Sequence, residues 1–596
     1  MSFYPVSSVN ANVEAEEDFD LALMVVAVPL SALRWPVREG VSGDGRSALV
    51  VAQAPAVRSG QLVVWLKVVA VAEAVVRRDG RVQVAGRPAD HARLGVLEEE
   101  LDTRCGPGTI DRVAAGVRLD GVDSKVKGVL PREMSVAFTL RATLLMTLMP
   151  HLGTGEVLRT LLGDLLILPW TRARVAPSSK VLSTWRAAIG AGPMQELRRL
   201  VLAASVAEHR GAEPGIEVGG RLRLGAIDGS VTRMPDTPGN RAQFGTAGAA
   251  LTGYPQIRHL HLSDAFTRAT LAVVTGAAGG DKAEAEQGLL DRALKDYPHL
   301  FTRDRLWVMD RNFPGVKRIQ AILGTGSHVL IRVKSGIRLP RIGPVNPDGS
   351  YPALVTGADG TSLKVRVIEY HITLAGKTTP ELFCLITDLH DWIEHPAHLL
   401  AAAYRWRWDG SETALREAKS TLHEAGPGLG AILRSKSATL IEQEHAAWIS
   451  ATELVHALTR TAATTAAAFT KGPRAGRRAQ ARDLSFTTAR HAAIASITTT
   501  TAAAHLNSSA RQRAHHEVLS IVAGSRVTTD RNRHRERKVK SGQSFAHAPR
   551  DIATTIVPAI IHVCGASTPT ATATTTDLRP PVPRQTPPAK NAEYAA

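Results

Sequence analysis

The stretch RLWVMDRNFPGVKRIQAILGTGSHVLIRV, residues 305–333, decides the fold class of this chain. Its mostly apolar runs Arg305–Met309 and His328–Val333 predict two buried strands. Between them, apolar residues spaced three and four apart over Val316–Leu323 predict a helix. Strand, helix and strand in this order indicate part of a sheet that helices cover.

Upstream of this stretch, short apolar runs continue. We expect strands at Leu222–Ile227, Gln256–Leu262 and Ala269–Val274, followed by a helix at Asp281–Tyr297. Together with the first stretch the order becomes β-β-β-α-β-α-β, which is typical of an α/β fold with a mixed sheet.

Downstream, prolines and glycines mark loops from residue 335 onward. Strands are expected at Ser362–Thr373 and Glu381–Thr387, so residues 335–395 form a β-rich segment. A long helix with a flaw at Gly410 is expected over His398–Thr421.

The charge of the chain predicts a polyanionic partner. Lysine and arginine number 72 against 55 aspartates and glutamates, a formal net charge of +17. Nucleic acid is the first choice, because basic side chains release counterions when they neutralise phosphates, and an anionic membrane surface is the alternative. No apolar run is long enough to span a bilayer, and no signal peptide precedes the chain's first apolar run. We therefore expect a cytoplasmic protein that has no membrane partner. The three cysteines have no zinc-site spacing.

Two aspartates follow apolar runs in a way that suggests chemistry. Asp228 follows LRLGAI, and Asp310 follows LWVM. A carboxylate at the end of a buried strand must be paired, hydrogen-bonded or bound to metal, and Mg²⁺ takes such ligands while leaving positions for phosphate oxygens and water. The alternative is that each aspartate only caps a turn or helix.

A third carboxylate lies in residues 404–420, YRWRWDGSETALREAKS. Glu412 and Lys419 are seven residues apart and therefore share a helix face. Aromatic rings interleaved with arginines, as in Tyr404–Trp408, suit stacking on bases and gripping of phosphate. The alternative is an amphipathic helix with salt bridges and two core tryptophans.

These residues resemble the insertion sequence 4 family of bacterial DDE transposases. Its helix signature is tyrosine, two residues, arginine, three residues, glutamate, six residues and lysine. The spacing from Tyr404 to Arg407 matches the signature, and so does the spacing from Glu412 to Lys419. Between Arg407 and Glu412, however, there are four residues where the signature has three. The alternatives for the acidic position are Asp409 and Glu417.

Both aspartates lie in motifs that are similar to those of the same family. AIDGS, residues 226–230, is similar to its first aspartate motif. The second motif is usually Asp-x-Gly followed by an aromatic residue, and here it reads Asp310-Arg311-Asn312-Phe313, with asparagine in place of glycine. The resemblance covers roughly residues 100–460.

The resemblance implies a ribonuclease-H-like catalytic core in which Asp228, Asp310 and Glu412 bind two Mg²⁺ (or Mn²⁺) ions. It implies cleavage at transposon ends followed by strand transfer into target DNA. The partners would be the terminal inverted repeats and target DNA, bound by a homodimer in a synaptic complex. Without a phosphate-binding loop, no nucleotide cofactor is expected. The residues expected to contact DNA are Tyr404, Arg407, Lys419 and Arg311.

We expect six segments along the chain. They are a variable N-terminal extension (1–95), a helical domain that binds DNA ends (96–212), the first part of the catalytic core (213–334), a β-rich insertion (335–395), the last part of the core with the glutamate helix (396–465), and a basic, low-complexity, largely disordered C-terminal region (466–596). For the helical domain, a packed helical cap without a DNA role is the alternative.

Two other functions remain open at this point. One is a non-catalytic DNA-binding remnant of a transposase, and the other is a metal-dependent DNA nuclease without strand transfer. The His259-Leu260-His261 pattern is similar to that of single-strand nucleases with a tyrosine nucleophile, but buried or exposed strand histidines are commoner. Basic clusters at 471–482 and 531–540 either touch DNA phosphates or form a solvated tail.

Overall fold

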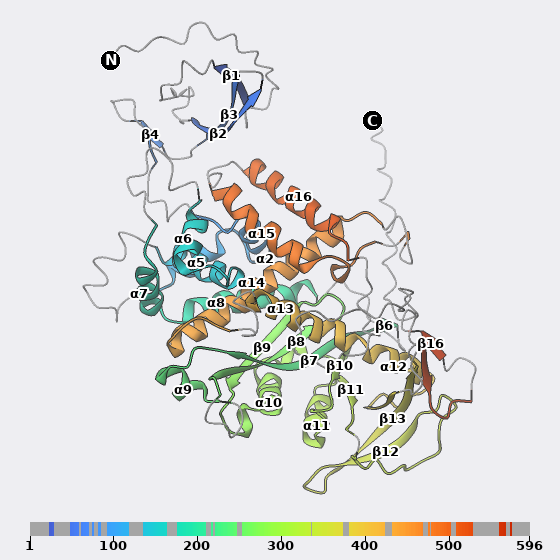
Figure 1. Ribbon diagram of the computed structural model, residues 1–596. Helices are drawn as coiled ribbons and strands as arrows, with labels where there is room; N and C mark the ends of the chain where they lie inside the picture. The colour runs from blue at the N-terminus through green and yellow to red at the C-terminus, as the bar shows by residue number, and fades with distance from the viewer. Residues whose placement is uncertain are drawn as a thin grey trace, which may run out of the picture. The chain divides into compact units, whose positions relative to one another are not determined.

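A computed structural model gives the architecture of the chain (Figure 1). It describes residues 23–28, 48–58, 61–70, 74–76, 82–84, 92–118, 135–163, 176–209, 216–217, 221–246, 253–334, 336–373, 381–423, 432–468, 475–476, 478–501, 508–527, 560–567 and 572–574. The chain forms two compact units. The first unit comprises residues 1–197 and 488–521, and the second comprises residues 198–487 and 522–596.

The second unit is built on one mixed sheet. Its central strands are, in sheet order, β9 (Thr270–Ala277), β8 (Gln256–Asp264), β7 (Arg221–Arg233), β10 (Arg305–Met309) and β11 (His328–Arg332). The first three pair antiparallel, whereas β10 runs parallel to β7 and β11 parallel to β10. Three consecutive strands, β7, β8 and β9, thus form an antiparallel set, and the parallel strands β10 and β11 are added on the free side of β7. This order confirms the expected α/β, ribonuclease-H-like arrangement.

The β-rich segment extends the same sheet. Its strands are β12 (Tyr351–Thr356), β13 (Ser362–Thr373) and β14 (Glu381–Thr387). The last two have the expected bounds, and β14 pairs antiparallel with β11. Two late strands, β15 (Ile560–Val563) and β16 (Thr572–Thr574), complete the edge beyond β13. The role of residues 335–395 as a separate insertion stays a prediction.

Helices cover both faces of this sheet (Figure 1). On one face α10 (Glu286–Asp296) and α11 (Val316–Gly324) pack against a core that includes Ile227, Trp307 and Met309. On the other, α12 (Ala397–Tyr404) packs against a core with residues of even number in the same strands, such as Leu224 and Val308. The alternation follows from the two-residue period of a strand.

The long helix expected after residue 398 is interrupted at its predicted flaw. It consists of α12, a π-helix at Trp408–Thr413 and α13 (Ala414–His423). The next helix, α14 (Ala438–Thr465), is 28 residues long and almost wholly buried.

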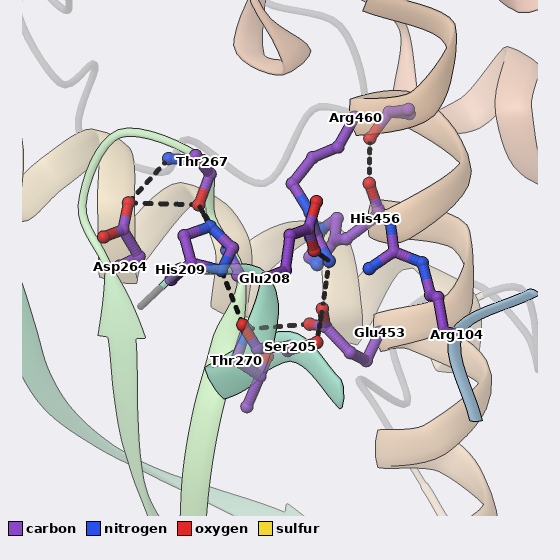
Figure 2. Close-up of polar contacts among 12 residues, drawn as sticks. Arg104, Ser205, Glu208, His209, Asp264, Thr267, Thr270, Glu453, His456 and Arg460 are labelled. Atoms are coloured by element: carbon purple, nitrogen blue, oxygen red, sulfur yellow. Dashed lines mark hydrogen bonds and ion pairs between the residues drawn. The ribbon is translucent and has the colours of Figure 1, made fainter. Parts of the chain in front are cut away.

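A buried acid ties α14 to the sheet (Figure 2). Glu453 accepts hydrogen bonds from Ser205 Oγ on α8 (Gly192–Glu208) and from the backbone nitrogen of Thr270, both at 2.7 Å. Arg460 pairs with it, also at 2.7 Å. Burial opposes ionisation of Glu453, but Arg460 and these hydrogen bonds outweigh it and lower its pKa. Glu453 is therefore ionised, and its carboxylate binds the backbone at the start of β9.

The first unit combines small β elements with helices. The strands are β1 (Leu23–Val28), β2 (Ala48–Arg58) and β3 (Gln61–Ala70) in one sheet, with β4 (Ala74–Val76) and β5 (Val82–Val84) as a pair. The helices are α2 (Val96–Cys105), α3 (Thr109–Ala115), α5 (Val136–Leu148), α6 (Thr154–Leu162), α7 (Ser179–Ile189), most of α15 (Phe486–Thr501) and α16 (Ser508–Gly524). The buried Arg141 joins three of them, pairing with Glu98 at 2.5 Å and Asp111 at 2.8 Å.

Two of these helices correct the expectation of a largely disordered region after residue 466. Residues 486–501 and 508–524 are helical. Alanine is the strongest helix former, and its abundance there favours helix over disorder. Among the described residues, none of the helices is both long and apolar enough for a membrane span.

Candidate active site

Asp228 and Asp310 are neighbours at the point where β10 ends. In the parallel pairing of β7 with β10, Met309 is opposite Ile227, so the residues that follow them come next to each other. The residues two positions before each aspartate pack on the α12 face, which places both carboxylates on that face. The apolar run before Asp228 had suggested that this residue follows a strand. Because β7 continues to Arg233, Asp228 lies within the strand.

The two carboxylates are in an unfavourable electrostatic position. Burial raises the pKa of Asp228, and the charge of Asp310 adds to this, while Arg407 opposes it. Asp228 accepts hydrogen bonds from the backbone nitrogen of Gly229 at 3.0 Å and from Ser411 Oγ at 3.1 Å. Like charges held together in a half-buried place are a situation that a bound divalent cation relieves.

The π-helix accounts for the extra residue between Arg407 and Glu412. A π turn holds one residue more than an α turn, so an insertion is absorbed without rotating the following helix out of phase. Ser411 in this turn also donates to the carbonyl of Arg407 at 2.9 Å. Gly410 allows the turn to lie on β8, because a Cβ there would come within 2.4 Å of Ala265 Cα.

Arg407 interacts electrostatically with the three predicted carboxylates. Its Nη1 lies 3.5 Å from Asp228 Oδ2. Burial lowers the pKa of Arg407, but Tyr404 and then the charges of Asp228, Glu412 and Asp310 raise it above its ordinary value. The charges of all three acids therefore act on one guanidinium.

Lys419 belongs to the same group. Burial lowers the pKa of its ammonium, while the charges of Asp228 and Glu412 raise it. The charges of both acids thus act on Lys419, which follows Glu412 by seven residues along the helix.

The donor set fits a divalent cation by its chemistry. The three predicted carboxylates come from β7, from the end of β10 and from the π-helix, and oxygen donors of this kind are what Mg²⁺ and Mn²⁺ take. Within the described ranges, no three side chains of histidine, cysteine, aspartate or glutamate stand close enough together to enclose an ion. The metal assignment therefore stays a prediction.

The structure distinguishes Glu412 from Glu417, one of its two alternatives on the helix. Glu417 is buried and pairs with Arg268 at 2.9 Å and with His456 at 3.3 Å. Its carboxylate is thus engaged by groups other than those that surround Asp228. The side chain of Asp409 lies outside the described residues.

The residues expected to contact DNA differ in exposure. Arg311 is exposed and Lys419 is half-buried. Arg407 and Tyr404 are only 7% and 2% exposed. Tyr404 packs in the α12 core and hydrogen-bonds Arg407, so it supports that guanidinium, and its direct contact with DNA stays a prediction.

Of the two tryptophans expected either to stack on bases or to pack in the core, only one is a core residue. Trp406 is a core residue, with its ring centroid 4.8 Å from that of Phe266 and Arg482 lying 4.2 Å above it. Trp408 is half-buried, and Arg407 lies 4.8 Å over its ring. Stacking on a base is therefore not a role for Trp406 in this conformation.

Sequence reasoning missed two residues at this site. Ser411, which donates to Asp228, stands beside the predicted Glu412 and had no signal of its own. Glu286 at the start of α10 feels the charges of both Asp310 and Asp228. It lay inside the expected helix Asp281–Tyr297, past its first turn, and had no signal of its own.

The histidines of β8 are internal residues. His259 and His261 are buried, and they hydrogen-bond each other at 2.9 Å. Burial lowers the pKa of His261 to about 3, so its ring is neutral. Tyr254, the tyrosine that precedes them in the sequence, is 53% exposed, whereas both histidines are buried. Of the basic clusters, Lys471, Arg474, Arg477 and residues 531–540 lie outside the described residues.

The chain is similar to known proteins. The family described as "Transposase DDE domain" matches residues 219–425. The transposase InsG for insertion sequence element IS4 from Escherichia coli (strain K12) is 27% identical over 292 residues, which are 47% of this chain. The chain spans 60% of the length of that relative.

A solved structure is also similar. The piggyBac transposase synaptic complex with hairpin DNA has a TM-score of 0.36 and 12% identity, over 76% of this chain and 88% of the other. The family match begins just before β7 and ends just after α13, so it encloses Asp228, Asp310 and Glu412. Residues 219–425 are thus similar to a transposase DDE domain, and the chain is similar to a transposase of insertion sequence element IS4.

Proposed function

We propose that the protein is a metal-dependent DNA transposase that cleaves transposon ends and joins them to target DNA. The observation that supports the proposal is the adjacency of Asp228 and Asp310 at the end of β10, with Arg407 Nη1 3.5 Å from Asp228 Oδ2. Asp228, Asp310 and Glu412 would hold the divalent cations, Mg²⁺ or Mn²⁺, with two ions as the expected number. Bound cations would supply Lewis acidity for water activation and for stabilisation of the leaving oxygen.

The basic residues of the site have separate roles in this proposal. Arg407 binds a phosphate at the scissile bond, since its Nε is buried with no hydrogen-bond partner in the described part of the chain. Tyr404 fixes the orientation of Arg407, and Ser411 that of Asp228. Lys419 and the exposed Arg311 contact neighbouring phosphates of the end strand.

The reaction has two stages in one site. Water attacks the phosphodiester at the transposon end, and the departing group is the 3′ oxygen, which leaves as a free 3′-hydroxyl. That hydroxyl then attacks a target phosphodiester, so one phosphodiester replaces another and no nucleotide is consumed. Two copies of the chain would hold the two ends together.

The test is Asp310→Asn with Asp296→Asn as the matched control, since Asp296 is an exposed aspartate at the far end of α10. The substrates are duplexes carrying the inverted repeats that flank the gene, either intact or already cleaved. We expect Asp310→Asn to lose cleavage and strand transfer by at least about 10³-fold, because removal of one charge stabiliser costs 10²–10³-fold and here a ligand is also lost. Its DNA binding should survive.

Each other outcome selects a different function. Cleavage without joining of pre-cleaved ends would favour a nuclease. Binding without cleavage by the unmodified chain would favour a non-catalytic remnant. Cleavage that persists in Asp310→Asn would remove the proposed triad.

A further inference from the structure

The turn between β8 and β9 contains a backbone conformation that its residue disfavours. Arg268 in this turn has a φ of 59°, and among the described residues it is the one non-glycine residue with a positive φ. A side chain in this left-handed region is crowded by its own backbone, which glycine avoids. Such strain persists only where the surroundings hold it, and it often occurs at functional sites. What holds Arg268 in this conformation therefore bears on function.

Asp264, the last residue of β8, fixes the shape of the turn. Its Oδ1 accepts hydrogen bonds from the backbone nitrogen of Thr267 at 3.1 Å and from Thr267 Oγ1 at 3.0 Å (Figure 2). The backbone nitrogen of Arg268 donates to the carbonyl of Asp264 at 3.0 Å. The strained backbone of Arg268 thus belongs to a turn that several hydrogen bonds hold in one shape.

The side chain of Arg268 forms an ion pair with the helix that follows Glu412. Its Nη1 lies 2.9 Å from Glu417 Oε1 on α13, and the two side chains are only 8% and 7% exposed. His456 Nε2 on α14 hydrogen-bonds the other oxygen of Glu417, at 3.3 Å. A buried ion pair adds little to stability, because lost solvation offsets the attraction, and its better-supported role is to fix one arrangement of the elements that carry it. The pair therefore fixes how α13 lies against the turn.

The same turn makes a second contact with this helical segment, before Glu412. Gly410 in the π-helix lies so close to Ala265 that a Cβ on the glycine would come within 2.4 Å of the alanine Cα. Contacts at positions 410 and 417 therefore enclose Glu412 in the sequence. The turn follows β8, in which His261 is paired with Asp228 of β7. Through the two contacts, the strand beside Asp228 determines the position and rotation of the segment that carries Glu412.

Stability alone does not explain a strained arginine at this position. Glycine would adopt the φ of residue 268 without strain, and an uncharged pair would fill the buried space without the cost of desolvating two charges. A disfavoured backbone combined with a buried charge pair fits instead the holding of a functional group in one place.

We propose that Arg268 is a positioning residue for Glu412. Its ion pair with Glu417 sets the rotation of α13, and with it the place of the Glu412 carboxylate in the proposed site. Arg268 acts only through the helix and touches neither DNA nor cation. The inference rests on the proposed function, because it takes Glu412 as a residue of the active site.

The test removes both charges of the pair and keeps the hydrogen bond of His456. In the double variant Arg268→Met with Glu417→Gln, the new amide can still bond His456, and no buried charge is left unpaired. We expect its thermal midpoint to stay within about 5 °C of that of the unmodified chain, since such replacements are close to neutral. In single-turnover cleavage of inverted-repeat duplexes, the maximal rate should fall about 10–100-fold, as misplacement of a reacting group does. The protein concentration at half-maximal rate should not change, because the contacts with DNA remain.

Two further variants separate positioning from other effects. Arg268→Lys keeps a cation beside Glu417 and should recover most of the maximal rate. Arg318→Gln is the matched control, since it breaks an ion pair of similar length, 2.8 Å, between Arg318 on α11 and the exposed Asp291 on α10. This control should cleave as the unmodified chain does.

A double variant that cleaves at the rate of the unmodified chain would show the inference to be wrong. A thermal midpoint lowered by more than about 5 °C would also overturn it, because the pair would then hold the fold and not the site. Glu412→Gln tells the two proposals apart. If this variant has lost cleavage while the double variant has not, the proposed function stands. If Glu412→Gln cleaves normally, or the unmodified chain does not cleave, the proposed function fails as well.

Discussion

The ionised carboxylate of Asp228 destabilises the folded state, because it is largely buried and lies beside Asp310. Its side chain is 16% exposed, and burial with the charge of Asp310 favours the neutral acid. The pKa of Asp228 in the folded chain is raised above the ordinary value, so the folded state holds the proton more tightly than the unfolded state does. The corresponding stability is present below the ordinary pKa and is lost as the pH rises through the raised one.

This reasoning predicts that Asp228→Asn stabilises the protein at neutral pH. In buffer with a metal chelator, thermal unfolding at pH 7.5 should show a midpoint about 2–4 °C higher, the usual effect of about 1 kcal/mol in a domain of this size. The gain should shrink below about pH 4, where the aspartate of the folded chain is also protonated. Asp296→Asn is the control, and a lower midpoint for Asp228→Asn would contradict the argument.

At the scale of elements, the π-helix decides where the third carboxylate lies. Its wide turn lets Ser411 reach Asp228 and returns the chain to an α-helix for Lys419. The close contact of Gly410 with Ala265 fixes the turn against β8.

We therefore expect Gly410→Ala to destabilise the second unit by about 1–3 kcal/mol, the usual effect of forcing a methyl group into filled space. The shift of the turn should also reduce end cleavage, since Ser411 and Glu412 move with it. Urea denaturation and the cleavage assay measure the two effects. Gly324→Ala at the end of α11 is the control, because a Cβ there has no atom within 4 Å. Equal behaviour of the two variants would show that the contact is not restrictive.

Local patterns predicted most elements of the second unit but not their relations. β10, β13 and β14 have the expected bounds, since apolar runs flanked by turn residues are local signals. The π-helix was visible only as a flaw at Gly410, because a one-residue insertion does not say how a helix absorbs it. The position of the Glu286 side chain over Gly229 could not be predicted, because that contact joins residues 57 apart in the sequence.

At the scale of the whole molecule, charge complements the acidic site. The carboxylates would meet DNA phosphates of the same sign, which repel them unless cations intervene. The formal net charge of +17 supplies a long-range attraction that brings the polyanion to the protein before any local contact forms. Binding and catalysis should therefore depend on different residues and respond differently to salt.

The consequence is a steep salt dependence of DNA binding that survives loss of the site. If the protein neutralises about five phosphates, the logarithm of the affinity for a random duplex should fall with a slope of about −4 to −5 against the logarithm of salt concentration. Between 50 and 200 mM salt, this is a loss of about 10²–10³-fold, measured by fluorescence anisotropy in a metal chelator. Asp310→Asn should show a similar slope, since the charge that attracts DNA is spread over the chain. A slope near zero would mean that the positive charge does not face DNA, and a slope lost in Asp310→Asn would mean that binding and catalysis share one site.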